Sequence, residues 1–96
     1  MKPSRALELK RAAVREAASR FRTVNPRIFG SVLYGTDTEG SDLDLLVDAL
    51  PGTTLFDLGA LQVELEDLLG VRVDLLTPGD LPVKFRARVL GEARPV

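Results

Sequence analysis

The chain contains no cysteine, no histidine and no tryptophan among its 96 residues. Without cysteine there can be no disulfide, no thiolate nucleophile and no thiolate metal site. Without histidine, a histidine-based catalytic triad and a histidine-ligated zinc ion are both excluded. Any bound metal ion must therefore be held by oxygen, which favours Mg²⁺, Mn²⁺ or Ca²⁺.

Long apolar runs are also missing from the sequence. No run approaches the ~20 residues that span a bilayer, and Met1 leads into a charged segment instead of an apolar leader. We therefore expect no membrane segment and a cytoplasmic location. The 13 Lys and Arg residues nearly balance the 14 Asp and Glu residues, so the net charge of −1 predicts no direct binding to nucleic acid. The length predicts a single domain over residues 1–96 with one modest core.

Hydrophobic spacing and turn residues predict elements in the order helix, strand, strand, helix, strand, helix. Ser4 is expected to cap the first helix, and Asn25-Pro26 to end it. Thr54 and Asp57 fit a capping box before a run of leucines spaced three and four apart. The predicted helices cover 4–22, 55–69 and a last segment from about residue 80, and the predicted strands end near 29 and cover 42–48 and 71–76. The fold class is therefore α/β (α+β), a small mixed sheet of about three strands backed by helices.

Gly30-Ser31 interrupts the short apolar stretch 27–33 and predicts a turn from the first strand into a short helical turn that ends at Tyr34. Glycine lets a backbone approach a phosphate closely, and the serine hydroxyl adds a hydrogen-bond donor. The alternative is a plain turn between a strand and a loop, which is the commoner meaning of a lone Gly-Ser pair.

Asp42 and Asp44 alternate with apolar residues on the predicted strand 42–48, so their side chains point to the same face, about 7 Å apart. Two like charges at this spacing destabilise each other unless a cation lies between them. Asp74 lies on the next predicted strand and can join them if the two strands pair, which would make a two-metal site. The alternative is ordinary alternation of polar and apolar residues at solvent-facing strand edges.

Other charged residues are expected on solvated surface. Asp37 and Glu39 lie in the predicted loop at 36–40. Arg86, Arg88 and Arg94 lie near the C-terminus, either on a solvated helix face or in a basic patch that meets a nucleotide or an acidic partner.

The joint spacing of Gly30-Ser31, Gly35 and Ser41-Asp42-Leu43-Asp44 resembles the signature of the nucleotidyltransferases related to DNA polymerase beta. Val73-Asp74-Leu75-Leu76 and the ending Arg88-Val89-Leu90-Gly91-Glu92-Ala93 are similar to the minimal nucleotidyltransferases (MNT proteins). The resemblance covers most of the chain and implies the polymerase beta-like nucleotidyltransferase fold.

The resemblance also implies a function and a set of site residues. MNT proteins commonly act as antitoxins beside a HEPN-domain toxin, and some of them transfer AMP from ATP to a tyrosine of that toxin. By position, Asp42 and Asp44 would hold Mg²⁺ on the nucleotide phosphates, and Asp74 would bind a second ion and help to deprotonate the acceptor hydroxyl. Gly30 and Ser31 would contact the triphosphate, and Ser41 is also expected to bind the nucleotide. Two Mg²⁺ ions, with Mn²⁺ as a substitute, and ATP are the implied cofactor and substrate.

Position 34 departs from the family pattern, because family members often have Ala-Arg where this chain has Leu33-Tyr34. An arginine there would supply a charged fork of donors near phosphate or partner, and a tyrosine does not. The sequence therefore leaves two functions open: catalytic transfer of AMP to the toxin, or neutralisation of the toxin by stoichiometric binding. Transfer to a small molecule or nucleic acid is less favoured, because 96 residues leave little room for a domain that binds such an acceptor. Self-association and a complex with the toxin are both compatible with the sequence.

Overall fold

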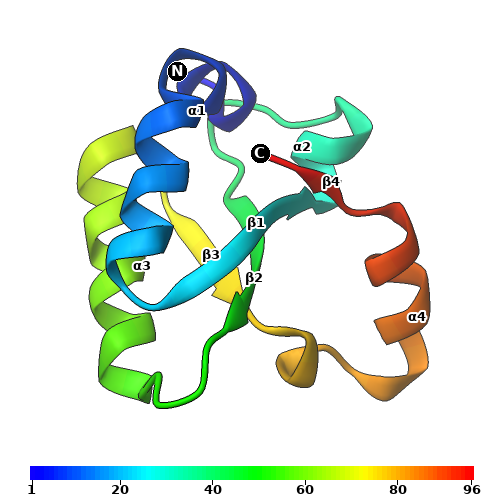
Figure 1. The fold of residues 1–96 in the computed structure, drawn as a ribbon. Helices are drawn as coiled ribbons and strands as arrows, with labels where there is room; N and C mark the ends of the chain where they lie inside the picture. Colours follow the sequence, from blue (N-terminus) through cyan, green and yellow to red (C-terminus); the bar gives the residue numbers. More distant parts are fainter.

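The computed structural model describes residues 1–96 and contains one mixed sheet with helices on both sides (Figure 1). Helices α1 and α3 lie together on one face of the sheet, whereas α4 lies on the other side of the molecule. The elements are α1 (Pro3–Arg20), β1 (Thr23–Phe29), α2 (Gly30–Tyr34), β2 (Leu43–Ala49), α3 (Leu55–Leu69), β3 (Val73–Leu76), the 3-10 turn η1 (Pro78–Asp80), α4 (Val83–Glu92) and β4 (Arg94–Pro95). No helix combines the length and the apolar character that crossing a membrane requires.

The strand order is β3-β2-β1-β4. Strand β2 runs antiparallel to β1 and parallel to β3. The second pair is parallel because α3 carries the chain from the end of β2 back to the end of the sheet where β2 begins. The predicted mixed sheet is confirmed, with one strand more than expected. The additional strand, β4, pairs only Arg94 and Pro95 with β1, and two residues give no periodicity that a sequence pattern could reveal.

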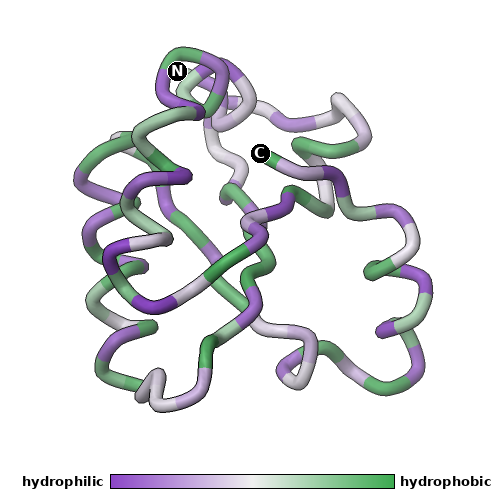
Figure 2. Tube along the Cα trace, viewed as in Figure 1, coloured by the Kyte–Doolittle hydropathy of each residue, from purple (hydrophilic) through white to green (hydrophobic).

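The core lies between the sheet and the pair α1 and α3. Leu43 and Leu45 of β2 are fully buried and face these helices, as the alternation predicts. Leu46 points to the opposite face with Asp44, yet it is also fully buried, because β2 packs against η1 on that side. Figure 2 shows the apolar segments concentrated along the central strands, whereas α4 alternates between apolar and polar residues.

The N-terminus of α1 differs from the prediction. Lys2, and not Ser4, occupies the N-cap position, and its side chain makes no cap hydrogen bond. The cap comes instead from Asp37, whose Oδ2 accepts a hydrogen bond of 2.8 Å from the backbone N–H of Ser4. Asp37 was expected in solvent but is only 6% exposed. Burial opposes its ionisation, but the hydrogen bonds from Ser4 and the charge of Lys2 outweigh burial and lower the pKa of Asp37.

The segment after α1 also differs. The helix ends at Arg20, before Asn25-Pro26, and β1 begins at Thr23. Asn25 adopts a left-handed conformation (φ 56°), and the pairing of β1 with β2 is irregular between Val24 and Arg27. Asn25-Pro26 is therefore accommodated inside a strand as a bulge and does not end the helix.

Helix α3 has the predicted termini. Thr54 and Asp57 form the capping box, and Gly70 ends the helix in the left-handed conformation with φ 68°. Leu61, Leu65 and Leu69 are buried. Leu55, the first leucine of the predicted run, was expected on the same apolar face of the helix but is 86% exposed. One turn at the start of the helix therefore extends past the sheet.

Helix α4 begins at Val83, three residues after Asp80, near which the last helix was predicted to begin. Asp80 caps η1 instead, where its Oδ2 accepts hydrogen bonds from the backbone and hydroxyl of Thr77. Arg86, expected on a solvated helix face or in a basic patch, instead donates to the carbonyl oxygens of Gly79 and Leu81 and so fastens α4 to η1. No residue of α4 is buried.

Candidate active site

Asp44 and Asp74 lie side by side on neighbouring parallel strands, where they are direct register partners in β2 and β3. Adjacent strands are about 4.8 Å apart, so these two side chains share one face at close range. Asp42 lies two positions before Asp44, immediately ahead of β2, and is in phase with it. The structure therefore brings the three predicted carboxylates into one neighbourhood at the same end of the sheet.

The pKa of Asp44 reports how crowded this neighbourhood is. Partial burial raises it first, and the negative charges of Asp74 and then Asp42 raise it further, from 3.8 to about 6. A cation between these carboxylates would lower the pKa again, since it favours the ionised form. The electrostatics and the all-oxygen donors fit a divalent ion such as Mg²⁺.

The side chains do not yet converge on a single point. No group of three or more acidic side chains is arranged so that it could hold a metal ion. Asp42 Oδ1 instead forms an ion pair of 3.0 Å with Nε of Arg72, on the residue just before β3. Both side chains are substantially exposed, so this pair is weak and easily broken. Binding of a metal ion by all three carboxylates requires Asp42 to leave Arg72.

Gly30 places the start of α2 directly against this group. Its φ of +71° is unfavourable for any residue with a side chain, and a Cβ added there would overlap Asp44 Oδ2. Only glycine allows the backbone to approach the carboxylate so closely. Ser31 follows Gly30 within the same short helix and is partly exposed. Its contact with a triphosphate stays a prediction.

Ser41 has a different environment. Its hydroxyl accepts a hydrogen bond of 2.9 Å from the backbone N–H of Thr38, and its own N–H donates to the Thr38 carbonyl oxygen at 3.0 Å. These bonds close the loop that leads into Asp42. The hydroxyl of Ser41 is thus engaged in shaping the loop, and its contact with a nucleotide stays a prediction.

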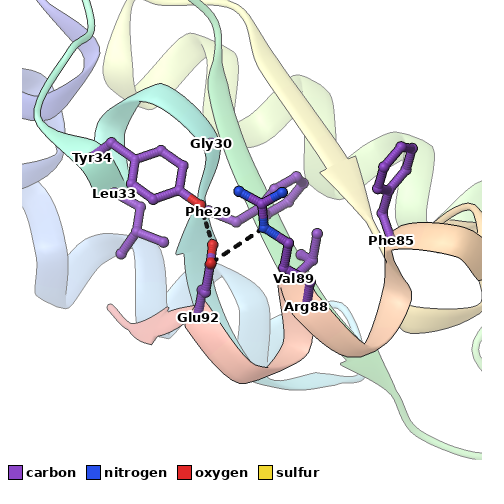
Figure 3. A pocket seen from close by; sticks show the side chains of 8 residues that line it. All are labelled: Phe29, Gly30, Leu33, Tyr34, Phe85, Arg88, Val89 and Glu92. Atoms are coloured by element: carbon purple, nitrogen blue, oxygen red, sulfur yellow. Dashed lines mark hydrogen bonds and ion pairs between the residues drawn. The ribbon is translucent and has the colours of Figure 1, made fainter.

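Tyr34 contacts a part of the chain that sequence reasoning did not connect with it. Its hydroxyl donates a hydrogen bond to Glu92 of α4, and Nε of Arg88 lies 3.3 Å from the other oxygen of Glu92 (Figure 3). The hydrogen bond with Glu92 is the main reason that the pKa of Tyr34 is raised. The three residues are separated by more than 50 positions at the widest, so no local pattern could reveal this cluster.

The cluster stands at one side of a cavity of about 160 Å³ between α2 and α4. Gly30 lines this cavity as well as touching Asp44, so the cavity adjoins the carboxylate group. Figure 3 shows the lining side chains: Phe29, Gly30, Leu33, Tyr34, Phe85, Arg88, Val89 and Glu92.

Comparison with known proteins agrees with this geometry. Residues 10–96 match the family model of the nucleotidyltransferase domain. The chain belongs to the nucleotidyltransferase domain family. Among solved structures of similar fold, a candidate minimal nucleotidyltransferase is 44% identical, with a TM-score of 0.87 over 97% of this chain and 95% of that chain. The protein is thus a minimal member of the nucleotidyltransferase family, as the motif spacing indicated.

Curated relatives of this nucleotidyltransferase are protein adenylyltransferases by name. MntA of Thermococcus cleftensis is 37% identical over 78 residues, which are 81% of this chain and 79% of MntA. A candidate protein adenylyltransferase of Methanocaldococcus jannaschii is 42% identical over 66 residues, 69% of this chain and 71% of the relative. A chain from a toxin–antitoxin structure with AMP-PNP shares the fold, with a TM-score of 0.70 and 21% identity over 83% of this chain and 66% of that chain.

Proposed function

We propose that this nucleotidyltransferase is an antitoxin that transfers AMP from ATP to a hydroxyl, expected to be a tyrosine, of a cognate HEPN-domain toxin and so neutralises it. The observation that carries the proposal is the pairing of Asp44 with Asp74 beside the backbone of Gly30. The curated relative MntA, named a protein adenylyltransferase, supports protein as the acceptor. The fold shared with a chain of a toxin–antitoxin structure supports a toxin as the partner.

Asp42, Asp44 and Asp74 are the residues that would hold Mg²⁺, with Mn²⁺ as a substitute. Two ions held there would supply positive charge to stabilise the attacking and leaving oxygens and would favour loss of the acceptor proton. This chemistry suits a chain without histidine, because the protein then needs to supply only positioning and charge.

The chain's own residues have two tasks in this scheme. Asp44 must be ionised to bind a cation, and with a pKa of about 6 it is mostly ionised at pH 7 and above. Gly30 and Ser31 bring backbone close to the carboxylates, where the triphosphate would lie. We expect the toxin to complete the acceptor side of the site.

A second function, neutralisation by stoichiometric binding without transfer, is favoured by one observation. The ion pair between Asp42 and Arg72 leaves the three carboxylates unconverged, as they would stay in an inactive site. The two functions differ in stoichiometry. One enzyme molecule can neutralise many toxin molecules in turn, whereas a binding protein must be present in an amount equal to the toxin.

The test is to incubate the protein at a substoichiometric ratio with toxin, ATP and Mg²⁺ and to measure intact masses. Transfer adds about 329 Da to the toxin for each AMP in the phosphoryl-transfer scheme. Asp44→Asn should abolish the addition, whereas the matched variant Asp67→Asn, on the exposed surface of α3, should retain it. Neutralisation without a mass change would favour stoichiometric binding, and full transfer by Asp44→Asn would exclude the assigned role.

A further inference from the structure

The cavity between α2 and α4 has walls of two kinds. Phe29 and Leu33 on one side face Phe85 and Val89 of α4 on the other, and together they make the lining mainly apolar. The charged groups are Arg88 and Glu92, which neutralise each other as an ion pair of 3.3 Å. The cavity therefore suits a neutral group with a large apolar face.

A phosphate chain does not fit this description. Glu92 already neutralises Arg88, so the cavity offers no unpaired positive charge to a phosphate, and its apolar walls could not solvate one. A flat heteroaromatic ring does fit, because aromatic and guanidinium planes stack on nucleobases and polar groups at the rim bind their edges. Arg88 extends from α4 with its guanidinium beside Glu92, among the residues that line the cavity (Figure 3).

The position of the cavity links it to a nucleotide. Gly30 both lines the cavity and lies against the carboxylate of Asp44, so a ligand in the cavity adjoins the carboxylates. A nucleoside triphosphate has this form, with a neutral planar ring at one end and metal-binding phosphates at the other.

We propose that the cavity between α2 and α4 binds the base of the nucleotide substrate while its phosphates lie at Gly30 and the carboxylates. This inference rests on the proposed function and adds to it the residues that hold the base. Glu92 is an acceptor only, so a base must offer it a donor. Adenine offers an amino group together with a larger face for the apolar walls than uracil, whose only free donor is its N3–H. A tyrosine ring of the partner is the competing occupant, and the variants and probes below distinguish it from a base.

Val89→Phe tests the proposal because it fills the cavity from α4. The matched control is Val83→Phe, the same substitution on the same helix at a residue that is 79% exposed and does not line the cavity. Since α4 contributes no buried residue to the core, both variants should fold, which circular dichroism and thermal unfolding can verify. The probes are α,β-methylene-ATP, which cannot transfer AMP, and inorganic tripolyphosphate, both with Mg²⁺ in titration calorimetry.

We expect Val89→Phe to weaken binding of α,β-methylene-ATP at least about fivefold, in line with the loss of one stacked base, and to leave tripolyphosphate binding unchanged. Val83→Phe should bind both probes as the wild type does. The wild type should also bind the adenine analogue more tightly than the corresponding uridine analogue.

Two results would overturn the proposal without touching the proposed function. One is equal binding of α,β-methylene-ATP by Val89→Phe and the wild type. The other is a Val89→Phe variant that loses affinity for the toxin and not for the nucleotide, which would assign the cavity to a partner side chain. If the wild type binds neither probe with Mg²⁺, the proposed function itself fails and the base site fails with it.

Discussion

Asp44→Asn should make the metal-free protein more stable at neutral pH, although the same substitution should abolish transfer. In the folded protein, burial and the charges of Asp74 and Asp42 raise the pKa of Asp44 from 3.8 to about 6, with no contribution from a hydrogen bond. A shift of about 2 units corresponds to roughly 3 kcal/mol of unfavourable free energy in the ionised folded state. Asp44 is only half-buried, so solvent screening reduces this to about 1–2 kcal/mol. An asparagine removes the charge and hence the penalty.

The pKa shift of Asp44 also fixes how the stability difference between the wild type and Asp44→Asn changes with pH. Between pH 3.8 and about 6 the folded state binds the proton of Asp44 more tightly than the unfolded state does. The stability of the wild type therefore falls as the pH rises through this window. Above about pH 6 the wild type is at its least stable compared with Asp44→Asn. The advantage of the variant should be full at pH 7.5 and should nearly vanish by pH 4.

Thermal unfolding followed by circular dichroism with EDTA measures this difference. For a chain of this size, 1–2 kcal/mol corresponds to a Tm roughly 5–15 °C higher for Asp44→Asn at pH 7.5. Asp48→Asn on the same strand is the matched control with the opposite sign, because Asp48 pairs at 2.6 Å with the largely buried Arg27. An Asp44→Asn variant that is no more stable than the wild type at pH 7.5 would refute the electrostatic crowding on which the metal site depends.

Two further substitutions test the geometry around the carboxylates. Gly30→Ala should weaken Mg²⁺ binding in titration calorimetry, because its Cβ would displace Asp44, whereas Gly35→Ala has the same left-handed strain (φ +72°) but open space around its Cβ and should bind Mg²⁺ normally. Equal Mg²⁺ affinities in these two variants would contradict the contact. Arg72→Gln should bind Mg²⁺ up to about fivefold more tightly, because it frees Asp42 from an exposed ion pair of at most about 1 kcal/mol, and Arg72→Lys, which keeps the charge, should lie in between. Weaker binding by Arg72→Gln would show that Arg72 supports the site instead of competing for it.

The carboxylate neighbourhood could be predicted because it depends on regular geometry. Alternation along β2 places Asp42 and Asp44 on one face, and a helix between two strands predicts their parallel pairing, which brings Asp74 alongside. The position of Gly30 beside the carboxylates was also predicted, since a glycine between a strand and a helical turn allows the backbone to approach a neighbouring group closely.

The features that sequence reasoning missed are contacts between distant segments. Asp37 caps α1 across 33 positions, and nothing in its own loop distinguishes it from a solvated acid. Tyr34 meets Glu92 across 58 positions because β4 draws the C-terminus back to β1. Strand β4 itself is held by backbone pairing of two residues, which leaves no side-chain pattern. Tertiary packing decides such features, and local periodicity does not report on it.

Helix α4 is fastened at its two ends and anchored nowhere between them. Arg86 ties its start to η1, the hydrogen bond from Tyr34 to Glu92 and strand β4 hold its end, and none of its residues enters the core. The free energy needed to lift this helix away should accordingly be far smaller than that of global unfolding. Local opening of one wall of the cavity would then leave β2, β3 and their aspartates undisturbed, so ligand selection could change in evolution while the reacting centre stays intact.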